Sequence, residues 1–199
     1  LLTYGTYSQA ESTMKFLLTG KISLKGNTYQ MTPNEWGLMV LFHNYLKNLE
    51  TDWDTSGLQR AIQFQIQDKC EERDREVNKL PEFQKNIFNS ITKGKPTKEV
   101  KKLVQEMILN EQGALKSLSP KYWANDIQEK VFILHGSNDT MVPFTESIQL
   151  ANELPNSELF ISHLYGHSEF SKGKGLLFNF VEIIKLIKFY ANFFNHYAN

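Results

Sequence analysis

The sequence predicts an α/β fold, with a parallel sheet in its C-terminal third and a helical segment before it. In the C-terminal third, short apolar runs at 131–136 and 157–162 alternate with helical patterns. Strands that alternate with helices across short loops are typical of a parallel sheet covered by helices. Residues 32–125 show helical periodicity and no strand pattern.

The C-terminal elements follow one another without long loops. The run VFILHG (131–136) is continuously apolar and stops at a glycine, as expected of a strand buried on both faces. A polar loop, 137–143, precedes a helix expected at about 145–154, which Pro155 ends. SELFIS then predicts a second strand, and a terminal helix is expected over 175–195. The first five residues, LLTYG, predict a third short strand.

The middle of the chain predicts several helices. Thr32 is the expected N-cap of a helix that reaches about residue 48, with Pro33 at its first position and Glu35 completing a capping box. Further helices are expected at about 56–78, 81–91 and 98–111. Before this block, residues 11–19 predict a helix and residues 20–31 a polar, turn-rich connection.

Charge balance and hydropathy exclude two classes of partner. Lys plus Arg and Asp plus Glu number 22 each, so the 199-residue chain is formally neutral and has no bulk electrostatic attraction to nucleic acid or an anionic membrane. No apolar run approaches the roughly 18 residues that cross a bilayer. The most apolar stretch, 175–194, is interrupted by Glu182, Lys185 and Lys188, which predicts an amphipathic helix on a core.

Cysteine and metal-ligand patterns add little chemistry. Cys70 is the sole cysteine, so no intrachain disulfide forms, and a reducing compartment such as the cytoplasm is slightly favoured. No cluster has metal-ligand spacing and no glycine-rich phosphate loop is present, so neither metal nor cofactor is expected. Because Leu1 rather than Met begins the sequence, we expect a piece of a longer protein, whose compartment is undetermined.

Two side chains are candidates for catalysis. Asp139 follows one predicted strand by three residues, and His167 follows the next by five. Catalytic groups gather at the carboxyl ends of parallel strands, so both are expected at one edge of the sheet. A carboxylate that accepts the Nδ1–H of a histidine leaves Nε2 free to remove a proton from a nucleophile.

The run 131–170 resembles the C-terminal part of the α/β-hydrolase superfamily. The matching positions are His135-Gly136, Asp139, Val142-Pro143 and Gly166-His167. The resemblance implies that Asp139 is the acid and His167 the base of a catalytic triad, in the order that the family uses. Lys130 departs from the pattern, since many members carry proline there.

The sequence supplies no recognisable nucleophile. The Gly-x-Ser-x-Gly elbow of this fold is absent, and the nearest match, GHSEF (166–170), has Phe170 in place of the last glycine. Ser168 is thus a weak alternative nucleophile, and His163 is a competing base.

The resemblance implies a division into a core strand (1–7), an all-helical cap (8–125) and the C-terminal part of the hydrolase core (126–199). We expect the C-terminal portion of a capped serine carboxylesterase or lipase-like enzyme that acts on a small ester or lipid-like substrate. Its nucleophile would lie upstream, so the chain alone is expected to be inactive. An open sheet edge predicts association with itself or with the missing N-terminal half.

The sequence is also compatible with two other functions. One is a non-catalytic interaction module or degenerate hydrolase relative. The other is a dehalogenase-like or epoxide-hydrolase-like enzyme with an upstream Asp nucleophile.

Overall fold

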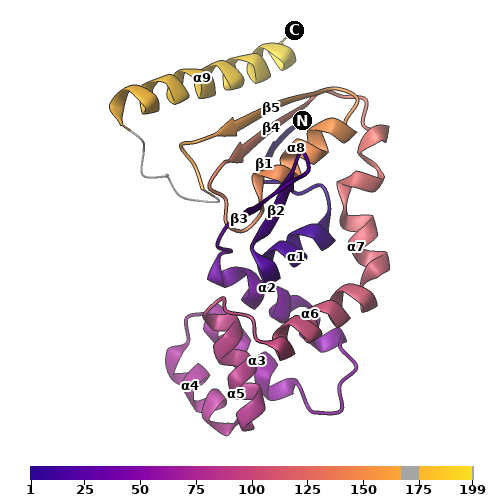
Figure 1. The fold of residues 1–199 in the computed structure, drawn as a ribbon, viewed down its shortest axis with the longest axis vertical. Helices are drawn as coiled ribbons and strands as arrows, with labels where there is room; N and C mark the ends of the chain where they lie inside the picture. The colour runs from indigo at the N-terminus through magenta and orange to yellow at the C-terminus, as the bar shows by residue number, and fades with distance from the viewer. Residues whose placement is uncertain (167–174, 199) are drawn as a thin grey trace. The chain divides into compact units, whose positions relative to one another are not determined.

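The computed structural model describes residues 1–166 and 175–198, and the chain divides into two compact units (Figure 1). The first, which we call the sheet unit, comprises Leu1–Phe16, Lys21–Thr32 and Leu115–Asn199. The second, the helical unit, comprises Leu17–Gly20 and Pro33–Ala114. The boundaries at residues 8 and 125 that we expect for a cap stay a prediction.

The sheet unit is built on three parallel strands. They are β1 (Leu2–Tyr4), β4 (Val131–Gly136) and β5 (Ser157–Ser162), in the order β1-β4-β5. Leu2 pairs with Phe132, and β5 pairs with β4 along its whole length, ending with Gly136 opposite Ser162. All three carboxyl ends therefore lie at the same edge. The predicted α/β class with a three-stranded parallel sheet is confirmed.

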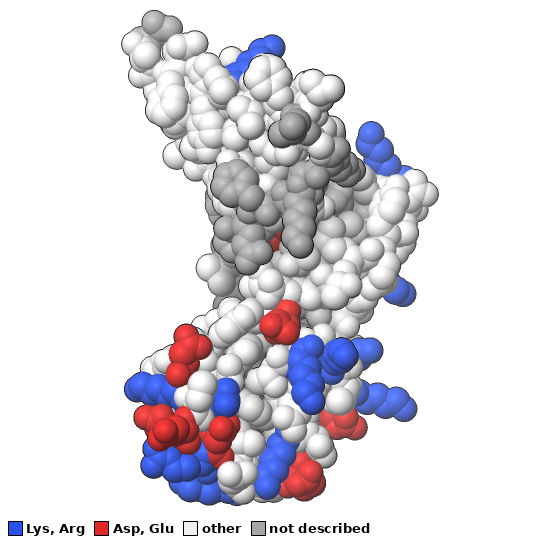
Figure 2. Space-filling model, turned by 90° about the vertical axis from the view of Figure 1, so that its left-hand side faces the viewer, with Lys and Arg blue, Asp and Glu red and all other residues white. Residues whose placement is uncertain are grey.

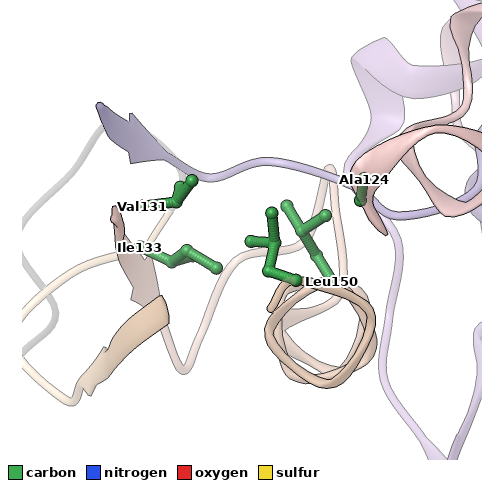
Figure 3. Close-up of a cluster of buried hydrophobic side chains, with 5 residues drawn as sticks. Ala124, Val131, Ile133 and Leu150 are labelled. Atoms are coloured by element: carbon green, nitrogen blue, oxygen red, sulfur yellow. The ribbon is translucent and has the colours of Figure 1, made fainter. Parts of the chain in front are cut away.

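Every residue of β4 is buried because helices cover both faces of this central strand. On one face, Val131 and Ile133 pack with Leu150 of α8 (Phe144–Glu153) and with Ala124, and Figure 3 shows these side chains converging. Alternate residues of a strand point to opposite faces, so the continuous apolar run in the sequence reflects a strand covered twice.

The other face of β4 is covered by α9 (Leu176–Ala198). Phe132 and Leu134 form a buried cluster with Phe189 of this helix. Figure 1 shows α9 and α8 on opposite sides of the sheet. Among the described residues, no helix combines the length and hydropathy that crossing a membrane requires.

Residues 21–30 correct the expectation of an all-helical segment. They form an antiparallel hairpin of β2 (Lys21–Leu24) and β3 (Asn27–Gln30). Lys25 and Gly26 have φ of 50° and 79°, as in the two-residue hairpin turns whose twist matches the strands. All of β3 is exposed, and in β2 only Ile22 is buried. The alternation of polar and apolar residues over Lys21–Leu24 is therefore too short to indicate a strand in this turn-rich stretch.

The other elements of the chain are mainly helical. They are α1 (Ala10–Thr19), α2 (Glu35–Tyr45), α3 (Ser56–Ile66), α4 (Cys70–Lys79), α5 (Glu82–Thr92), α6 (Lys98–Asn110) and α7 (Gln112–Leu118), with 3-10 turns at Leu46–Asn48, Pro120–Tyr122 and Ala124–Asp126. Charged residues of both signs intermingle over the helical segment (Figure 2), as expected of a solvated surface.

Two details of the helical unit differ from the sequence expectation. Helix α2 is capped by Asn34 rather than Thr32, because the Asn34 side chain accepts the backbone N–H of Trp36 at 2.9 Å. The single helix expected at 56–78 is two helices, because Asp68 adopts a left-handed φ of 55°. The N–H of Lys69 then bonds back to the carbonyl of Phe64, which closes α3 in a Schellman-type end.

Candidate active site

Asp139 lies in the loop after the central strand β4, and its side chain is fully buried. Oδ1 accepts hydrogen bonds from the backbone N–H groups of Met141 at 2.8 Å and Val142 at 2.9 Å. A carboxylate that bonds to the backbone two or three residues ahead holds its own loop in a turn. These two donors also stabilise a negative charge at a position without solvent.

His135, in the strand itself, holds the other side of this carboxylate. Its Nε2 lies 3.3 Å from Asp139 Oδ2 and 2.9 Å from the carbonyl oxygen of Val142. Both neighbours are acceptors, so Nε2 carries the proton. Ser147 Oγ lies 2.6 Å from Nδ1 and 3.1 Å from the carbonyl oxygen of Thr6. The ring thus links β4, the Asp139 loop and helix α8.

Gly136 allows the chain that follows β5 to cross the end of β4. A Cβ at this position would lie 2.4 Å from the Tyr165 carbonyl oxygen and 2.6 Å from that of Gly166. Such distances are shorter than any ordinary contact, so glycine is required for this close approach. The segment leading to His167 therefore passes directly over the strand end that leads to Asp139.

Tyr4, at the end of β1, reaches the same place. Its hydroxyl donates to the carbonyl oxygen of Gly166 at 2.9 Å. The pKa of Tyr4 is raised above its usual value, first by partial burial and then by the negative charge of Asp139. Tyr4 and Asp139 thus share one electrostatic environment at the carboxyl edge of the sheet.

His163, which the sequence offers as a competing base, is exposed and directly follows the end of β5. Its Nδ1 is 2.8 Å from Ser137 Oγ, and its backbone N–H donates to Glu182 Oε2 at 3.1 Å. Glu182 is almost completely buried and also accepts from Lys185 Nζ at 2.8 Å. These contacts attach α9 to the loop after β5.

His167 and Ser168, the candidate base and the weak alternative nucleophile, lie outside the described residues. What the structure brings together is Asp139, its support His135, and the chain up to Gly166. From the sequence, His135 was expected only as part of a strand-end motif, and no role was expected for Tyr4. The sequence contains a signal for both residues, because Tyr4 ends β1 directly before Gly5 and His135 directly precedes the terminal Gly136 of β4.

Lys130, the departure from the family pattern, has a structural role of its own. Its Nζ bonds to Glu158 Oε2 at 2.7 Å and lies 4.5 Å from the centre of the Phe132 ring. Within residues 1–166 and 175–198, no group of three or more His, Cys, Asp or Glu side chains is arranged to hold a metal ion.

Two open hollows lie within the helical unit. The larger, of about 580 Å³, and the smaller, of about 320 Å³, are both lined by Phe83, and Trp53 lines the smaller. Phe83 and Trp53 stack edge to face, with ring centres 5.3 Å apart. Some aromatic side chains of the helical unit are therefore available at its surface.

Comparison with known proteins bears on this arrangement. Residues 72–154 match the family BD-FAE. This is a domain found in α/β-hydrolase-like esterases, and the match indicates hydrolase-like function. It covers α4 to α8 and includes β4 and Asp139, although it spans under half of the chain. No curated protein and no solved structure matches the sequence.

Proposed function

We propose that this chain contributes to the hydrolysis of carboxylic esters by supplying the acid, Asp139, and the general base, His167, of a serine-hydrolase triad. The observation that carries the proposal is the fixation of Asp139, a buried carboxylate held from both sides at the carboxyl end of the central strand. The BD-FAE match over residues 72–154 supports ester chemistry.

The geometry suits a carboxylate that orients a histidine. Both backbone donors bond to Oδ1, and Oδ2 faces the Nε2–H of His135. An oxygen of a carboxylate has two lone pairs, so Oδ2 can accept from two donors. In the proposed triad one of those donors is the Nδ1–H of His167, the residue that directly follows Gly166 in the sequence.

The remaining chemistry needs a serine that residues 1–199 do not provide as a Gly-x-Ser-x-Gly elbow. We assign it to polypeptide outside this sequence. The serine hydroxyl would attack the ester carbonyl and pass its proton to Nε2 of His167. The imidazolium, stabilised by Asp139, would then protonate the departing alcohol, and water would release the acid in the same way.

An NMR titration of His167 tests the pairing without any turnover. A carboxylate within a few ångströms stabilises the imidazolium, so Asp139→Asn should lower the pH at which His167 titrates by about one to two units. The matched control is Asp126→Asn, at an exposed aspartate of the sheet unit, which should leave the titration unchanged. Identical His167 titrations in wild type and Asp139→Asn would overturn the assignment.

A turnover assay tests the origin of the nucleophile. The chain alone should not hydrolyse p-nitrophenyl acetate above the background rate. Turnover that disappears in both Ser168→Ala and His167→Ala would place the nucleophile inside this chain and contradict the proposal. Turnover unaffected by either substitution would point to a different reaction centre.

A further inference from the structure

Helix α9 has two apolar faces, of which the sheet covers one. Leu186, Phe189 and Phe193 pack against the Phe132 side of the sheet. On the opposite side, large apolar side chains remain in solvent; among them Leu177 is 84% exposed and Ile187 is 62% exposed. A surface helix whose outer face is apolar lacks the polar side that water favours.

The exposed apolar residues follow a heptad repeat. Steps of three and four residues, alternating without interruption, connect Leu177, Phe180, Ile184, Ile187, Ala191, Phe194 and Ala198, which we call the outer seam. All seven are exposed. This is the a and d spacing by which one helix packs along another, sustained here over three heptads. The residues that contact the sheet fall between the seam positions. The spacing therefore indicates that the partner of the outer seam is itself a helix.

The exposed area agrees with the requirement of a stable dimer. The outer seam and its apolar neighbours Val181 and Ile183 include seven large side chains between 44% and 84% exposed. With the ~150–250 Å² of a whole aromatic side chain as the scale, the exposed fractions of these seven side chains correspond to roughly 700 Å² of uncovered surface. The largest apolar patch of a typical monomer is ~300–600 Å², and a standard interface buries ~800 Å² on each partner.

We propose that the outer seam joins two copies of this chain through an antiparallel pair of α9 helices related by a two-fold axis. In this register Phe180 of one copy lies opposite Ala191 of the second copy, and Ile184 lies opposite the second copy's Ile187. A parallel pair would instead place phenylalanine against phenylalanine and alanine against alanine. Large residues opposite small ones fill a helix interface without clash or void, which favours the antiparallel pair.

The charges of α9 do not oppose this pairing. Lys185 is bonded to Glu182 of its own helix, on the side toward the sheet. Lys188 is exposed beside the outer seam, and its charge is attracted by the carboxylate of Glu158 in β5. The chain as a whole is formally neutral, so two copies have no net repulsion. A two-fold interface also closes on itself, so it yields a dimer rather than a filament.

Light scattering after size exclusion tests the dimer. Chain concentrations of about 10 μM and about 100 μM lie at or above the weakest dissociation constants of interfaces of this size. At both, the wild-type mass should approach twice the chain mass of 23.1 kDa. Ile184→Lys/Ile187→Lys should reduce it to the mass of one chain with an unchanged circular dichroism spectrum. A monomeric wild type, or a dimer that persists in the double variant, would overturn the proposal, as would open-ended aggregation.

A matched control separates the outer seam from apolar exposure in general. Leu109 of α6 is 62% exposed, the same as Ile187. Leu109→Lys should therefore leave the dimer intact, whereas Ile187→Lys should weaken it at least tenfold. Equal effects of the two substitutions would show that hydrophobicity alone, and not the seam, drives association.

Cysteine cross-linking tests the orientation. With the exposed Cys70 replaced by serine, a mixture of Ile184→Cys and Ile187→Cys chains should form a mixed disulfide on oxidation. Ile184→Cys alone should form far less, because its counterpart lies a helical turn away. Efficient self-cross-linking of Ile184→Cys would overturn the antiparallel arrangement.

Vesicle flotation tests the other occupant that an apolar helix face attracts, a lipid surface. Flotation with neutral or anionic phospholipid vesicles should be absent for the dimer. A wild-type monomer that floats, and loses flotation in Ile184→Lys/Ile187→Lys, would assign the outer seam to lipid and overturn the dimer.

Discussion

His135 Nε2 lies 3.3 Å from Asp139 Oδ2, and both side chains are completely buried. This contact joins a residue of the central strand to the loop that follows it, so the carboxylate is positioned by the strand itself. A catalytic group is most reproducibly oriented when its supports lie on rigid elements. The loop after β4 has such a support in His135.

Removal of the His135 ring should destabilise the sheet unit. His135→Ala leaves the Val142 carbonyl and Ser147 hydroxyl without this partner and opens a cavity, which should cost about 2–4 kcal/mol of unfolding free energy. Urea unfolding followed by circular dichroism measures the change. His43→Ala, at an exposed histidine of α2, should stay within about 0.5 kcal/mol of wild type. Equal losses would contradict the anchoring role.

Gly136→Ala should be destabilising because the new Cβ meets backbone oxygens that have no rotamer to change. With contacts of 2.4 Å and 2.6 Å to Tyr165 and Gly166, relief requires a shift of the loop, at a cost of about 1–3 kcal/mol. A Cβ added at Gly113 in α7 would have nothing within 4 Å, so Gly113→Ala should stabilise by about 0.5–1 kcal/mol. Opposite signs in urea unfolding are expected, and a neutral Gly136→Ala would refute the close approach.

The Glu182 carboxylate should make stability depend on acidic pH. Burial by itself raises its pKa, but hydrogen bonds from Lys185 and the His163 N–H outweigh burial and leave the pKa below its usual 4.5. A lowered folded-state pKa means that the stabilisation is complete above the usual value and is lost as pH falls through the folded value.

Glu182→Gln isolates this contribution. The variant should be less stable than wild type at about pH 7, and the difference should shrink at about pH 3 as the pH falls toward and through the lowered pKa of Glu182. Unfolding free energies at the two pH values measure it. A difference that is constant with pH would mean that packing, not ionisation, explains the effect of the substitution.

The N-cap of α2 can be tested by substituting its two candidate residues, Asn34 and Thr32, in turn. Asn34→Ala removes the acceptor for the Trp36 N–H and should cost about 1 kcal/mol. Thr32→Ala, at the position that the capping-box pattern predicts, should have an effect near zero. Thermal unfolding of both variants checks this, and the reverse order would restore the sequence-based assignment.

Elements with a strong local signal were predictable. The strand at 131–136 and its glycine end were evident because burial on both faces makes the run continuously apolar. The break between the helices expected at 81–91 and 98–111 was also predictable, because it contains a glycine; in the structure Gly94 adopts a φ of 60°, which favours glycine. By contrast, Asp68 ends α3 in the same left-handed region without glycine, so periodicity alone joined α3 and α4 into one helix.

Local signals were enough to establish the order of the main strands and helices and the place of Asp139 after a buried strand, because hydropathy period and turn residues act over short stretches of chain. Packing in three dimensions was needed to establish that His135 holds Asp139, that Gly166 crosses Gly136, and which face of α9 meets the sheet. Those contacts join residues that are distant in sequence or separated by a turn, and their geometry depends on how the strands pair and the helices pack. The charged residues within 175–194 predict an amphipathic helix on a core, but only the packing of α9 on the sheet reveals that its uncovered face is apolar.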